Sequence, residues 1–400
     1  MINNRTQIIN KHQISNYKNK KVWNFGIVAW RLFGICFLVL GVFAFVRSAN
    51  AATLYIFPDN ENFYEGQTFS ADVRLDTEGE RINAGEIELQ LDEESKNTLE
   101  LIDFTTGNSL FSLIVGGPDI DTENKKIFLQ AAHPGGFEGD GVIGTLILKA
   151  LNIGEANLSF SQESKLALAD GEGTPAEVKL EEATYIIEER PQNLPIVESQ
   201  SHPIESQWAG GTFIRMNWEV KEGATYSYVL SRNPNEVPDE VPEDAVGDVK
   251  LSTNQEGIFY FHLRECMAGG CGPVATRQVL RDVSPPKGFE IIPETEAGRR
   301  FLSFTTTDNI SGVSYYEILE GTHVTKIKNP PYILKDPQYK GKIIVKAFDK
   351  AGNVRQASIS LSGEKAAYNK WLVLGIIVSV AGIAIFNFIR KRRKLNIKNE

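Results

Sequence analysis

Short runs in which apolar and polar residues alternate dominate this chain from Thr53 to Ser362. In residues 69–75, 87–91 and 214–220 every second side chain is apolar. A period of two places alternate side chains on opposite faces of a strand, so these runs predict strands with one face toward water. No long stretch of this region shows the 3.6-residue apolar period of a helix. The region is therefore predicted to be all-β and to fold as tandem β-sandwiches.

Prolines divide the 400-residue chain into modules. Residues 190–206 contain Pro191, Pro195 and Pro203 and lack clear strand alternation, so they are predicted to be a semi-extended linker. Ser284-Pro285-Pro286 marks a second, shorter joint. The predicted modules occupy residues 52–189, 207–283 and 284–362.

The N-terminal residues have the layout of a secretory signal. A basic stretch that includes Lys11 and Arg31 precedes fifteen apolar residues at 32–46, and Ser48-Ala49-Asn50-Ala51 follows. This A-x-A pattern predicts a signal peptide at 1–51, cleaved after Ala51. Because the basic stretch is long and Arg47 follows the apolar run, an uncleaved N-terminal anchor is the alternative. Cleavage is favoured, since a membrane span needs about twenty apolar residues.

A second apolar segment lies near the C-terminus. Trp371–Ile389 contains nineteen residues and no charged side chain. As a helix it would be about 28 Å long, close to the thickness of a hydrocarbon core. The five cations of Arg390–Lys394 follow at once and act as a stop-transfer signal. The sequence thus predicts a single-pass cell-membrane protein, with a transmembrane helix at 371–389, a cytoplasmic tail at 390–400 and a large extracellular region.

Charge is distributed unevenly along the chain. Residues 1–51 carry seven Lys or Arg and no acidic residue, and residues 369–400 carry seven and one. Between them, 28 basic residues stand against 50 acidic ones. This asymmetry is typical of a chain whose ends face a membrane while its middle lies in water. An acidic body also argues against a nucleic-acid partner, which requires a basic surface.

Two cysteines fall in the predicted extracellular region. Cys266 and Cys271 flank a Met-Ala-Gly-Gly loop, and Cys36 lies in the signal segment. An oxidising environment and an even number of cysteines favour a disulfide between Cys266 and Cys271. A structural zinc site would need four ligands, and no histidine or second cysteine pair lies nearby in the sequence.

The first module, residues 52–189, resembles a cohesin domain and, more broadly, the sandwich family of cohesins and cellulose-binding modules. The resemblance rests on four segments that match the order of the family's strands: residues 69–75, 83–91, 139–150 and 154–160. It implies a jelly-roll sandwich. By the same resemblance, cohesins dock a small protein module through one sheet face, and their relatives bind polysaccharide.

The other two modules resemble immunoglobulin-like domains. Tyr226–Leu230, Gly257–Arg264 and the closing Asp282-Val-Ser-Pro-Pro286 are similar to fibronectin type III or immunoglobulin-like repeats of bacterial surface proteins. Residues 307–312 and 347–353 resemble segments of bacterial immunoglobulin-like domains, in which a strand runs into an Asp…Gly-Asn turn. The resemblance implies two further sandwiches.

Two short motifs could suggest a ligand. Gly139–Gly144 fits G-x-G-x-x-G, but a strand-like run follows where a dinucleotide site needs a helix, so a turn is predicted. Asp119–Asn124 has the carboxylates of a calcium loop, but the EF-hand glycine is replaced by Asn124 and its final glutamate by Gln130. A solvated turn is favoured there, although a looser calcium site stays open.

No residue pattern indicates catalysis. The five histidines are scattered, and His262, between Phe261 and Leu263, is expected to face solvent on a strand. Neither a nucleophile motif nor a phosphate-binding loop occurs in the sequence. The chain is predicted not to be an enzyme and to have no catalytic residue, no metal ligand and no cofactor other than the calcium left open above. Six aromatic residues of the first module could stack on sugar rings, but core packing explains most of them: Tyr55, Phe57, Phe63, Tyr64, Phe111 and Phe137.

These features predict an extracellular binding or adhesion protein. The first module would bind a protein module or a polysaccharide at the cell surface, and the other two would project it from the membrane as a stalk. Residues 52–189 hold 28 acidic and 8 basic residues, which favours a basic or calcium-bridged partner. The alternatives are a structural spacer of the cell envelope without a ligand, or a component of a surface polysaccharide-degrading system.

Overall fold

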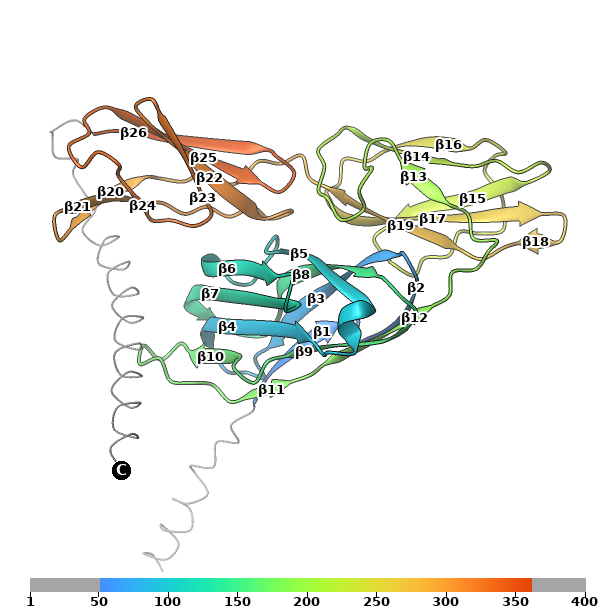
Figure 1. The fold of residues 1–400 in the computed structure, drawn as a ribbon, viewed down its shortest axis with the longest axis horizontal. Helices are drawn as coiled ribbons and strands as arrows, with labels where there is room; N and C mark the ends of the chain where they lie inside the picture. Colours follow the sequence, from blue (N-terminus) through green and yellow to red (C-terminus); the bar gives the residue numbers. More distant parts are fainter. Residues whose placement is uncertain (1–50, 362–400) are drawn as a thin grey trace, which may run out of the picture. The chain divides into compact units, whose positions relative to one another are not determined.

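Two facing β-sheets form each of the three parts of the region described by the computed structural model, residues 51–361 (Figure 1). These residues all belong to one compact unit. Their helical content is a single 3₁₀ turn, η1 (Ser95–Asn97). The chain is thus all-β over this range, as the alternating sequence predicts.

The predicted signal peptide, transmembrane segment at 371–389 and basic tail lie outside the described residues. Within residues 51–361, no helix is long and apolar enough to cross a membrane.

The first sandwich packs a five-stranded sheet on a seven-stranded one. The first sheet, in the order β11-β1-β3-β8-β5, consists of β1 (Ala52–Phe57), β3 (Thr68–Asp76), β5 (Leu99–Thr105), β8 (Asp140–Ala150) and β11 (Val178–Leu180). The second, in the order β2-β12-β9-β4-β7-β6 with β10 beside β4, consists of β2 (Asn60–Tyr64), β4 (Ile82–Leu91), β6 (Leu113–Asp121), β7 (Lys126–Phe137), β9 (Gly154–Phe160), β10 (Lys165–Leu168) and β12 (Ala183–Glu188).

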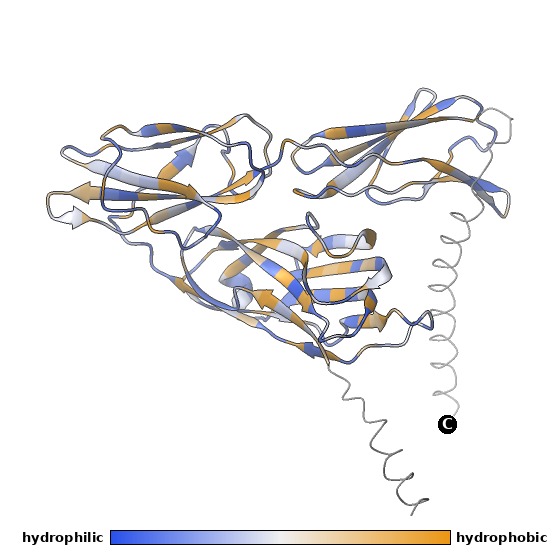
Figure 2. Ribbon diagram, turned by 180° about the vertical axis from the view of Figure 1, so that it is seen from behind, coloured by the Kyte–Doolittle hydropathy of each residue, from blue (hydrophilic) through white to orange (hydrophobic). Residues whose placement is uncertain are grey.

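The core of this sandwich follows from the alternation in the sequence. Ile87, Leu89 and Leu91 of β4 are buried between the sheets, and the residues between them point outward and are partly exposed. Tyr185 of β12 packs edge-on against Phe69 of β3, so aromatic rings join the two layers. Figure 2 shows hydrophobic and hydrophilic residues following one another along the strands.

The second sandwich has a three-stranded sheet and a four-stranded sheet. The first contains β13 (Val197–Ser199), β14 (Phe213–Trp218) and β16 (Asp248–Ser252), in the order β13-β14-β16. The second contains β15 (Thr225–Ser231), β17 (Gly257–Met267), β18 (Gly270–Cys271) and β19 (Ala275–Arg281), with β15, β18 and β19 all paired with β17. Trp218, Tyr226 and Phe261 lie together in its core.

The expected linker at 190–206 is part of this second sandwich, which corrects the prediction. β13 pairs with β14, and Leu194 and Val197 are buried in the core. Arg277 of β19 donates hydrogen bonds to the backbone carbonyls of Val197 and His202. The prolines interrupt the strand pattern of the segment, but its apolar residues still fill the core.

The third sandwich repeats the arrangement of one three-stranded and one four-stranded sheet. The first contains β20 (Ile292–Glu296), β21 (Arg299–Ser303) and β24 (Tyr332–Ile333), in the order β20-β21-β24. The second contains β22 (Val313–Glu320), β23 (His323–Ile327), β25 (Lys342–Asp349) and β26 (Val354–Ser360), in the order β23-β22-β25-β26. Ile318, Ile343 and Val345 are fully buried in its core.

The three sandwiches contact one another. A fourth apolar cluster unites Ile147 of the first sandwich with Trp208 and Leu280 of the second. Lys350 of the third sandwich donates to Asp103 of the first at 2.5 Å. The stalk predicted from the sequence would not bring the first and third modules together, so this expectation is corrected by these contacts.

Candidate functional site

The five-stranded sheet of the first sandwich is covered on its outer face by the rest of the chain. Six consecutive residues of β8, Ile143–Leu148, are buried, whereas a sheet with one wet face would show alternation. Ile147 points away from the sandwich core and packs on Trp208 and Leu280 instead. Beside it, Ser70 of β3 donates a 2.5 Å hydrogen bond to Gln278 of β19. This face is therefore closed by contacts with the second sandwich.

The seven-stranded sheet has a different outer face. Along β4, buried and partly exposed residues alternate regularly. The outward side chains bond to one another across neighbouring strands: Lys126 contacts Glu88 at 2.7 Å, and Gln130 donates to Glu86 at 3.0 Å. We call this surface the β4 face; its members are Glu86, Glu88, Gln90, Lys126, Phe128, Gln130, Glu155, Asn157, Thr184, Ile186 and Glu188.

Other parts of the described chain reach this sheet at its two edge strands. Asn235 of the second sandwich donates to Glu61 of β2 at 3.3 Å, and Lys328 of the third contacts Asp119 of β6 at 2.5 Å. The outward side chains of β9, β4 and β7 remain partly or largely exposed. The β4 face thus offers a surface to another molecule.

The β4 face is acidic. Glu86, Glu88, Glu155 and Glu188 outnumber its cation Lys126 and the neighbouring Lys165 of β10, which is paired in register with Glu86. Between them lie polar amides, and Ile186 is 41% exposed. Such a surface is complementary to a basic partner with a small apolar contact, and screening by salt would weaken that attraction.

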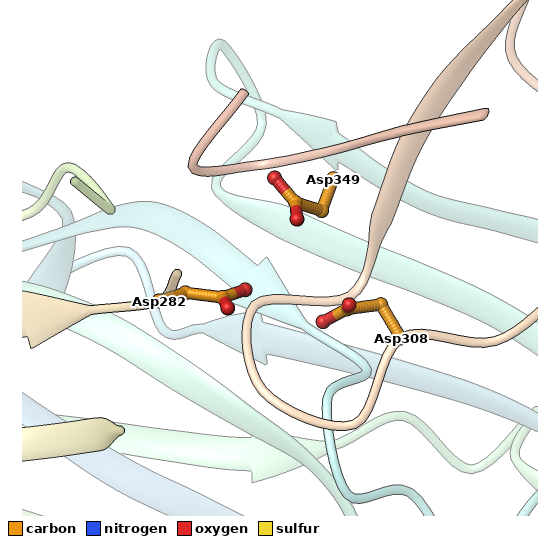
Figure 3. A group of neighbouring side chains, drawn as sticks. All are labelled: Asp282, Asp308 and Asp349. Atoms are coloured by element: carbon orange, nitrogen blue, oxygen red, sulfur yellow. The ribbon is translucent and has the colours of Figure 1, made fainter. Parts of the chain in front are cut away.

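Three buried aspartates converge where the second sandwich leads into the third (Figure 3). Asp282 follows β19, Asp308 lies between β21 and β22, and Asp349 ends β25. We call these residues the aspartate cluster; one carboxylate oxygen from each lies within 4.8 Å of the others. Burial raises the pKa of Asp282 to about 6, and the neighbouring Asp308 and Asp349 carboxylates add to the rise. Burial also raises the pKa of Asp349.

Sequence reasoning assigned no role to these aspartates. Each lies in a segment that resembles part of an immunoglobulin-like domain: residues 282–286, 307–312 and 347–353. The signal that points to them is the presence of one aspartate in each of these three segments. Their approach depends on the tertiary fold.

The acidic loop at residues 119–124 of the first sandwich was considered above as a looser calcium site. In the structure, its two aspartates contact other groups of the protein. Asp121 accepts hydrogen bonds from the backbone of Glu123 and Asn124 and from the Asn124 side chain. These hydrogen bonds lower the pKa of the exposed Asp121. Asp119 is paired with Lys328. The loop is thus organised as a turn between β6 and β7.

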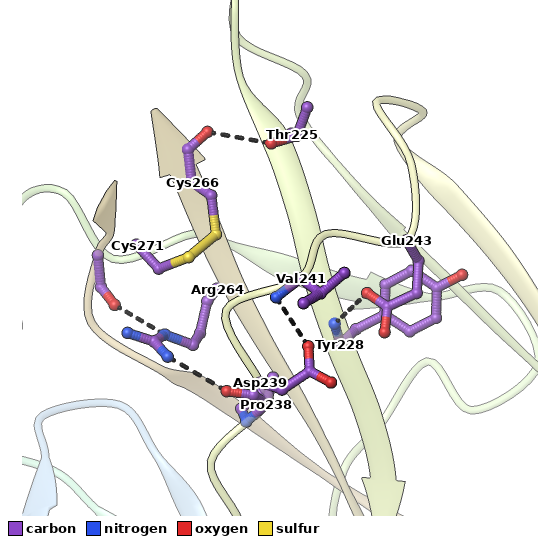
Figure 4. The surroundings of a disulfide bond; sticks show 10 residues. Thr225, Tyr228, Pro238, Asp239, Val241, Glu243, Arg264, Cys266 and Cys271 are labelled. Atoms are coloured by element: carbon purple, nitrogen blue, oxygen red, sulfur yellow. Dashed lines mark hydrogen bonds between the residues drawn. A yellow bond between two sulfur atoms is a disulfide. The ribbon is translucent and has the colours of Figure 1, made fainter. Parts of the chain in front are cut away.

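Cys266 and Cys271 form a disulfide with a Cα–Cα distance of 3.9 Å (Figure 4). The two residues are paired across the β17–β18 hairpin. Next to them, Arg264 donates to the backbone carbonyls of Gly272 and Pro238. The bridge therefore closes one end of the second sandwich.

His262 is fully buried, so the expectation that it faces solvent is wrong. One ring nitrogen lies 2.9 Å from Thr276 Oγ1 and the other 3.0 Å from the Asn233 carbonyl. The segment around Asn233 therefore covers the face of β17 that the alternating pattern predicts to be exposed to solvent. The ring links two parts of the second sandwich.

The other motifs singled out in the sequence also have structural positions. Gly139 precedes β8, so G-x-G-x-x-G leads into a strand, as predicted. The six aromatic residues do not share one surface: Phe63 and Phe111 are buried, Tyr55 bonds to Asp140, and Phe57 is 60% exposed. These rings do not provide a common platform for sugars.

Comparison with known proteins gives matches among solved structures. No protein-family model and no curated protein sequence matches the chain. A non-cellulosomal cohesin from Archaeoglobus fulgidus is 19% identical, covers 36% of this chain and 94% of its own, and has a TM-score of 0.29. A cohesin module from a Clostridium perfringens family 33 glycoside hydrolase is 14% identical over 35% and 97%, with a TM-score of 0.28. The third ScaB cohesin of R. flavefaciens, in complex with a group 1 dockerin, is 13% identical over 36% and 99%, with a TM-score of 0.28.

Proposed function

We propose that this chain is a membrane-anchored, non-catalytic docking protein that presents the β4 face to a protein module at the cell surface. One observation carries the proposal. Of the two outer faces of the first sandwich, that of β3 and β8 is covered by the protein itself, and the β4 face is left partly exposed. The first sandwich therefore has one sheet face, the β4 face, that a partner can reach.

The resemblance of the first module to cohesins agrees with this use. Cohesins dock a small protein module through a sheet face, and the R. flavefaciens cohesin similar to part of this chain was solved with a dockerin. The acidic side chains of the β4 face favour a partner with a basic surface. Mutual bonds such as Lys126–Glu88 hold these side chains in place before binding, which lowers the entropic cost of association.

The proposed location is the outer side of the cell membrane. The support is the uncharged stretch 371–389 with its basic flank, together with the signal-like N-terminus. Cell fractionation followed by protease treatment of intact cells would test it. A full-length chain that pellets with membranes and loses its acidic region to external protease supports the topology, and a chain recovered in the soluble fraction contradicts it.

Docking can be tested with the fragment 51–361, in which all three cores and six sheets are complete. The wild-type fragment and a Glu86→Lys/Glu155→Lys variant of the β4 face would be used to capture secreted and cell-surface material. We expect a protein that the wild type retains at low salt, that the variant loses at least tenfold, and that high salt releases.

A matched control makes the same two glutamate-to-lysine changes outside the β4 face. Glu222→Lys/Glu240→Lys alters two exposed glutamates of the second sandwich and should capture the same protein as the wild type. Equal capture by both variants would contradict docking through the β4 face. Eluates that contain glycan and no specific protein would favour polysaccharide binding, and empty eluates would favour a structural spacer.

A further inference from the structure

The aspartate cluster joins two sandwiches through carboxylates that have almost no access to solvent. Asp282, Asp308 and Asp349 are 0%, 5% and 2% exposed. Asp282 belongs to the segment that leaves the second sandwich, and the other two belong to the third. The cluster therefore lies where the described chain passes from the second sandwich into the third.

The negative charge of the cluster is not balanced by side chains of residues 51–361. None of the ion pairs in this region includes Asp282, Asp308 or Asp349. The neighbouring Lys350 pairs with Asp103 of the first sandwich instead. Burying several carboxylates side by side is unfavourable unless a cation or a proton compensates them.

Hydrogen bonds from the backbone and from one side-chain amide position the carboxylates, and they leave an oxygen of Asp308 free to bind an ion. Oδ1 of Asp308 accepts hydrogen bonds from the backbone of Ile310, Ser311 and Gly312 at 2.9–3.1 Å. Among residues 51–361, no hydrogen-bond donor contacts its second oxygen, which can therefore serve as a ligand. Asp349 is held by the backbone and side-chain amide of Asn353 at 2.8 and 2.9 Å. Asp282 accepts hydrogen bonds from the backbone of Ser284 and Ser311 at 3.0 and 3.2 Å, so all three carboxylates are held in place.

A separate observation is the hydroxyl of Ser311. Ser311 is fully buried, and within residues 51–361 its Oγ has no hydrogen-bond partner. The backbone N–H of the same residue donates to Asp282 and Asp308, so the hydroxyl lies beside the cluster. A buried hydroxyl without a partner is costly, so an oxygen directed at a carboxylate cluster indicates a missing ligand.

We propose that Asp282, Asp308, Asp349 and the Ser311 hydroxyl bind a calcium ion. The donors are all hard oxygens, and no histidine or cysteine belongs to the group, which disfavours zinc. Oxygens that share a calcium at 2.3–2.6 Å lie at most about 5 Å apart, so a separation within 4.8 Å is suitable. Magnesium demands a near-ideal octahedral geometry and usually keeps several waters, so a buried group of protein oxygens suits calcium better.

The ion would fix the joint between the second and third sandwiches and support the first. Asn353 already donates to the backbone carbonyls of Asp282 and Ser284. In the loop between β21 and β22, which carries Asp308, the carbonyl of Ser311 accepts a hydrogen bond from Thr105 of the first sandwich. Calcium bound to Asp308 and Ser311 would therefore stabilise both contacts. This inference does not depend on docking through the β4 face.

Calorimetric titration of CaCl₂ into the chelator-treated fragment 51–361 tests the site directly. We expect one calcium per chain, weaker binding of MgCl₂, and a melting temperature that rises with calcium. Asp308→Asn should weaken calcium binding at least tenfold and abolish the calcium-dependent rise. The asparagine keeps an oxygen for the three backbone donors, so the variant should fold, which its melting temperature in chelator will show.

The matched control is Asp121→Asn in the turn between β6 and β7, which removes one carboxylate from the other acidic loop. This variant should bind calcium as the wild type does. The proposal is overturned if the wild type takes up no calcium at millimolar concentration, if Asp308→Asn binds it unchanged, or if Asp121→Asn is the variant that loses it. Tighter binding of magnesium than of calcium would overturn the choice of ion.

Discussion

Gly107 of the first sandwich lies directly against the backbone carbonyl of Ile310 in the third, and no Cβ atom would fit between them. A Cβ atom on the nearby Gly312 would lie 3.2 Å from the Gly107 nitrogen and from the hydroxyls of Thr105 and Thr106. Two backbones thus meet without intervening side chains, at the loop that also carries Asp308 and Ser311. The contact depends on glycine because any other residue would push the two loops apart.

Replacing Gly107 with alanine should loosen this contact. The clash involves backbone atoms, which cannot rotate away, so we expect the free energy of unfolding to fall by about 1–3 kcal/mol. Urea denaturation measures the loss, and hydrogen exchange should show faster amide exchange at residues 105–107 and 310–312. Gly288→Ala is the control, since nothing lies within 4 Å of a Cβ built there. Similar losses in both variants would contradict a close contact at Gly107.

The ion pair of Asp103 and Lys350 should contribute to the same interface. The two side chains are 26% and 18% exposed, and Lys350 also donates to the Phe104 carbonyl. Asp103→Asn would leave the lysine with a neutral partner in a partly buried position. We expect a loss of about 1–2 kcal/mol in urea denaturation, less than for a fully buried pair.

Glu163→Gln is the comparison for that measurement. Glu163 and its partner Lys165 are 76% and 46% exposed, so this variant should change stability by less than about 0.5 kcal/mol. An effect of Asp103→Asn no larger than that of Glu163→Gln would mean that the first and third sandwiches are not held together by this pair.

The Cys266–Cys271 disulfide should stabilise the second sandwich modestly. It closes a loop of a few residues, so the chain-entropy model gives a contribution of about 2 kcal/mol. Cys266→Ser/Cys271→Ser should lower the melting temperature of fragment 51–361 by several degrees. Reductant should lower that of the wild type similarly and leave the variant unchanged. A wild-type fragment that is insensitive to reductant while its thiols become titratable would refute this.

Local pattern was sufficient to predict much of the fold. Alternation over residues 87–91 and 214–220 predicts strands that the structure has as β4 and β14. The predicted apolar residues lie inside, except Val220, which follows the end of β14 and is exposed. The period-two rule works there because one face of each strand meets water. It does not say which outer face another module will cover.

The failures share that physical cause. His262 occupies an outward position of β17, and it is buried because the segment around Asn233 packs over it. Ile147 of β8, for which no exposure was predicted, is covered in the same way by the second sandwich. The strand β13 was missed because the prolines of residues 190–206 interrupt the apolar alternation. Leu194 and Val197 nevertheless fill the core of the second sandwich, which a local pattern does not show. The aspartate cluster could not be predicted from spacing, because its members come from three separate turns.

Acid should destabilise the second sandwich through His202. This side chain is 2% exposed, and burial lowers its pKa from 6.5 to about 4, with Arg281 and Arg277 adding repulsion. Its Nδ1 lies 2.9 Å from Ser201 Oγ, and its backbone carbonyl accepts from Arg277. The folded protein therefore keeps the ring neutral at pH values where the unfolded chain binds a proton.

The sign of the effect follows from proton linkage. Between pH 6.5 and 4 the unfolded state binds more protons at His202, so stability falls as the pH is lowered, by about 1–3 kcal/mol in total. His202→Asn keeps a polar group near Ser201 but does not titrate, so the drop in melting temperature between pH 7 and pH 5 should shrink. His323→Gln, at an exposed position, should leave the drop unchanged. If His202→Asn retains the full wild-type drop, acid acts on stability through other groups.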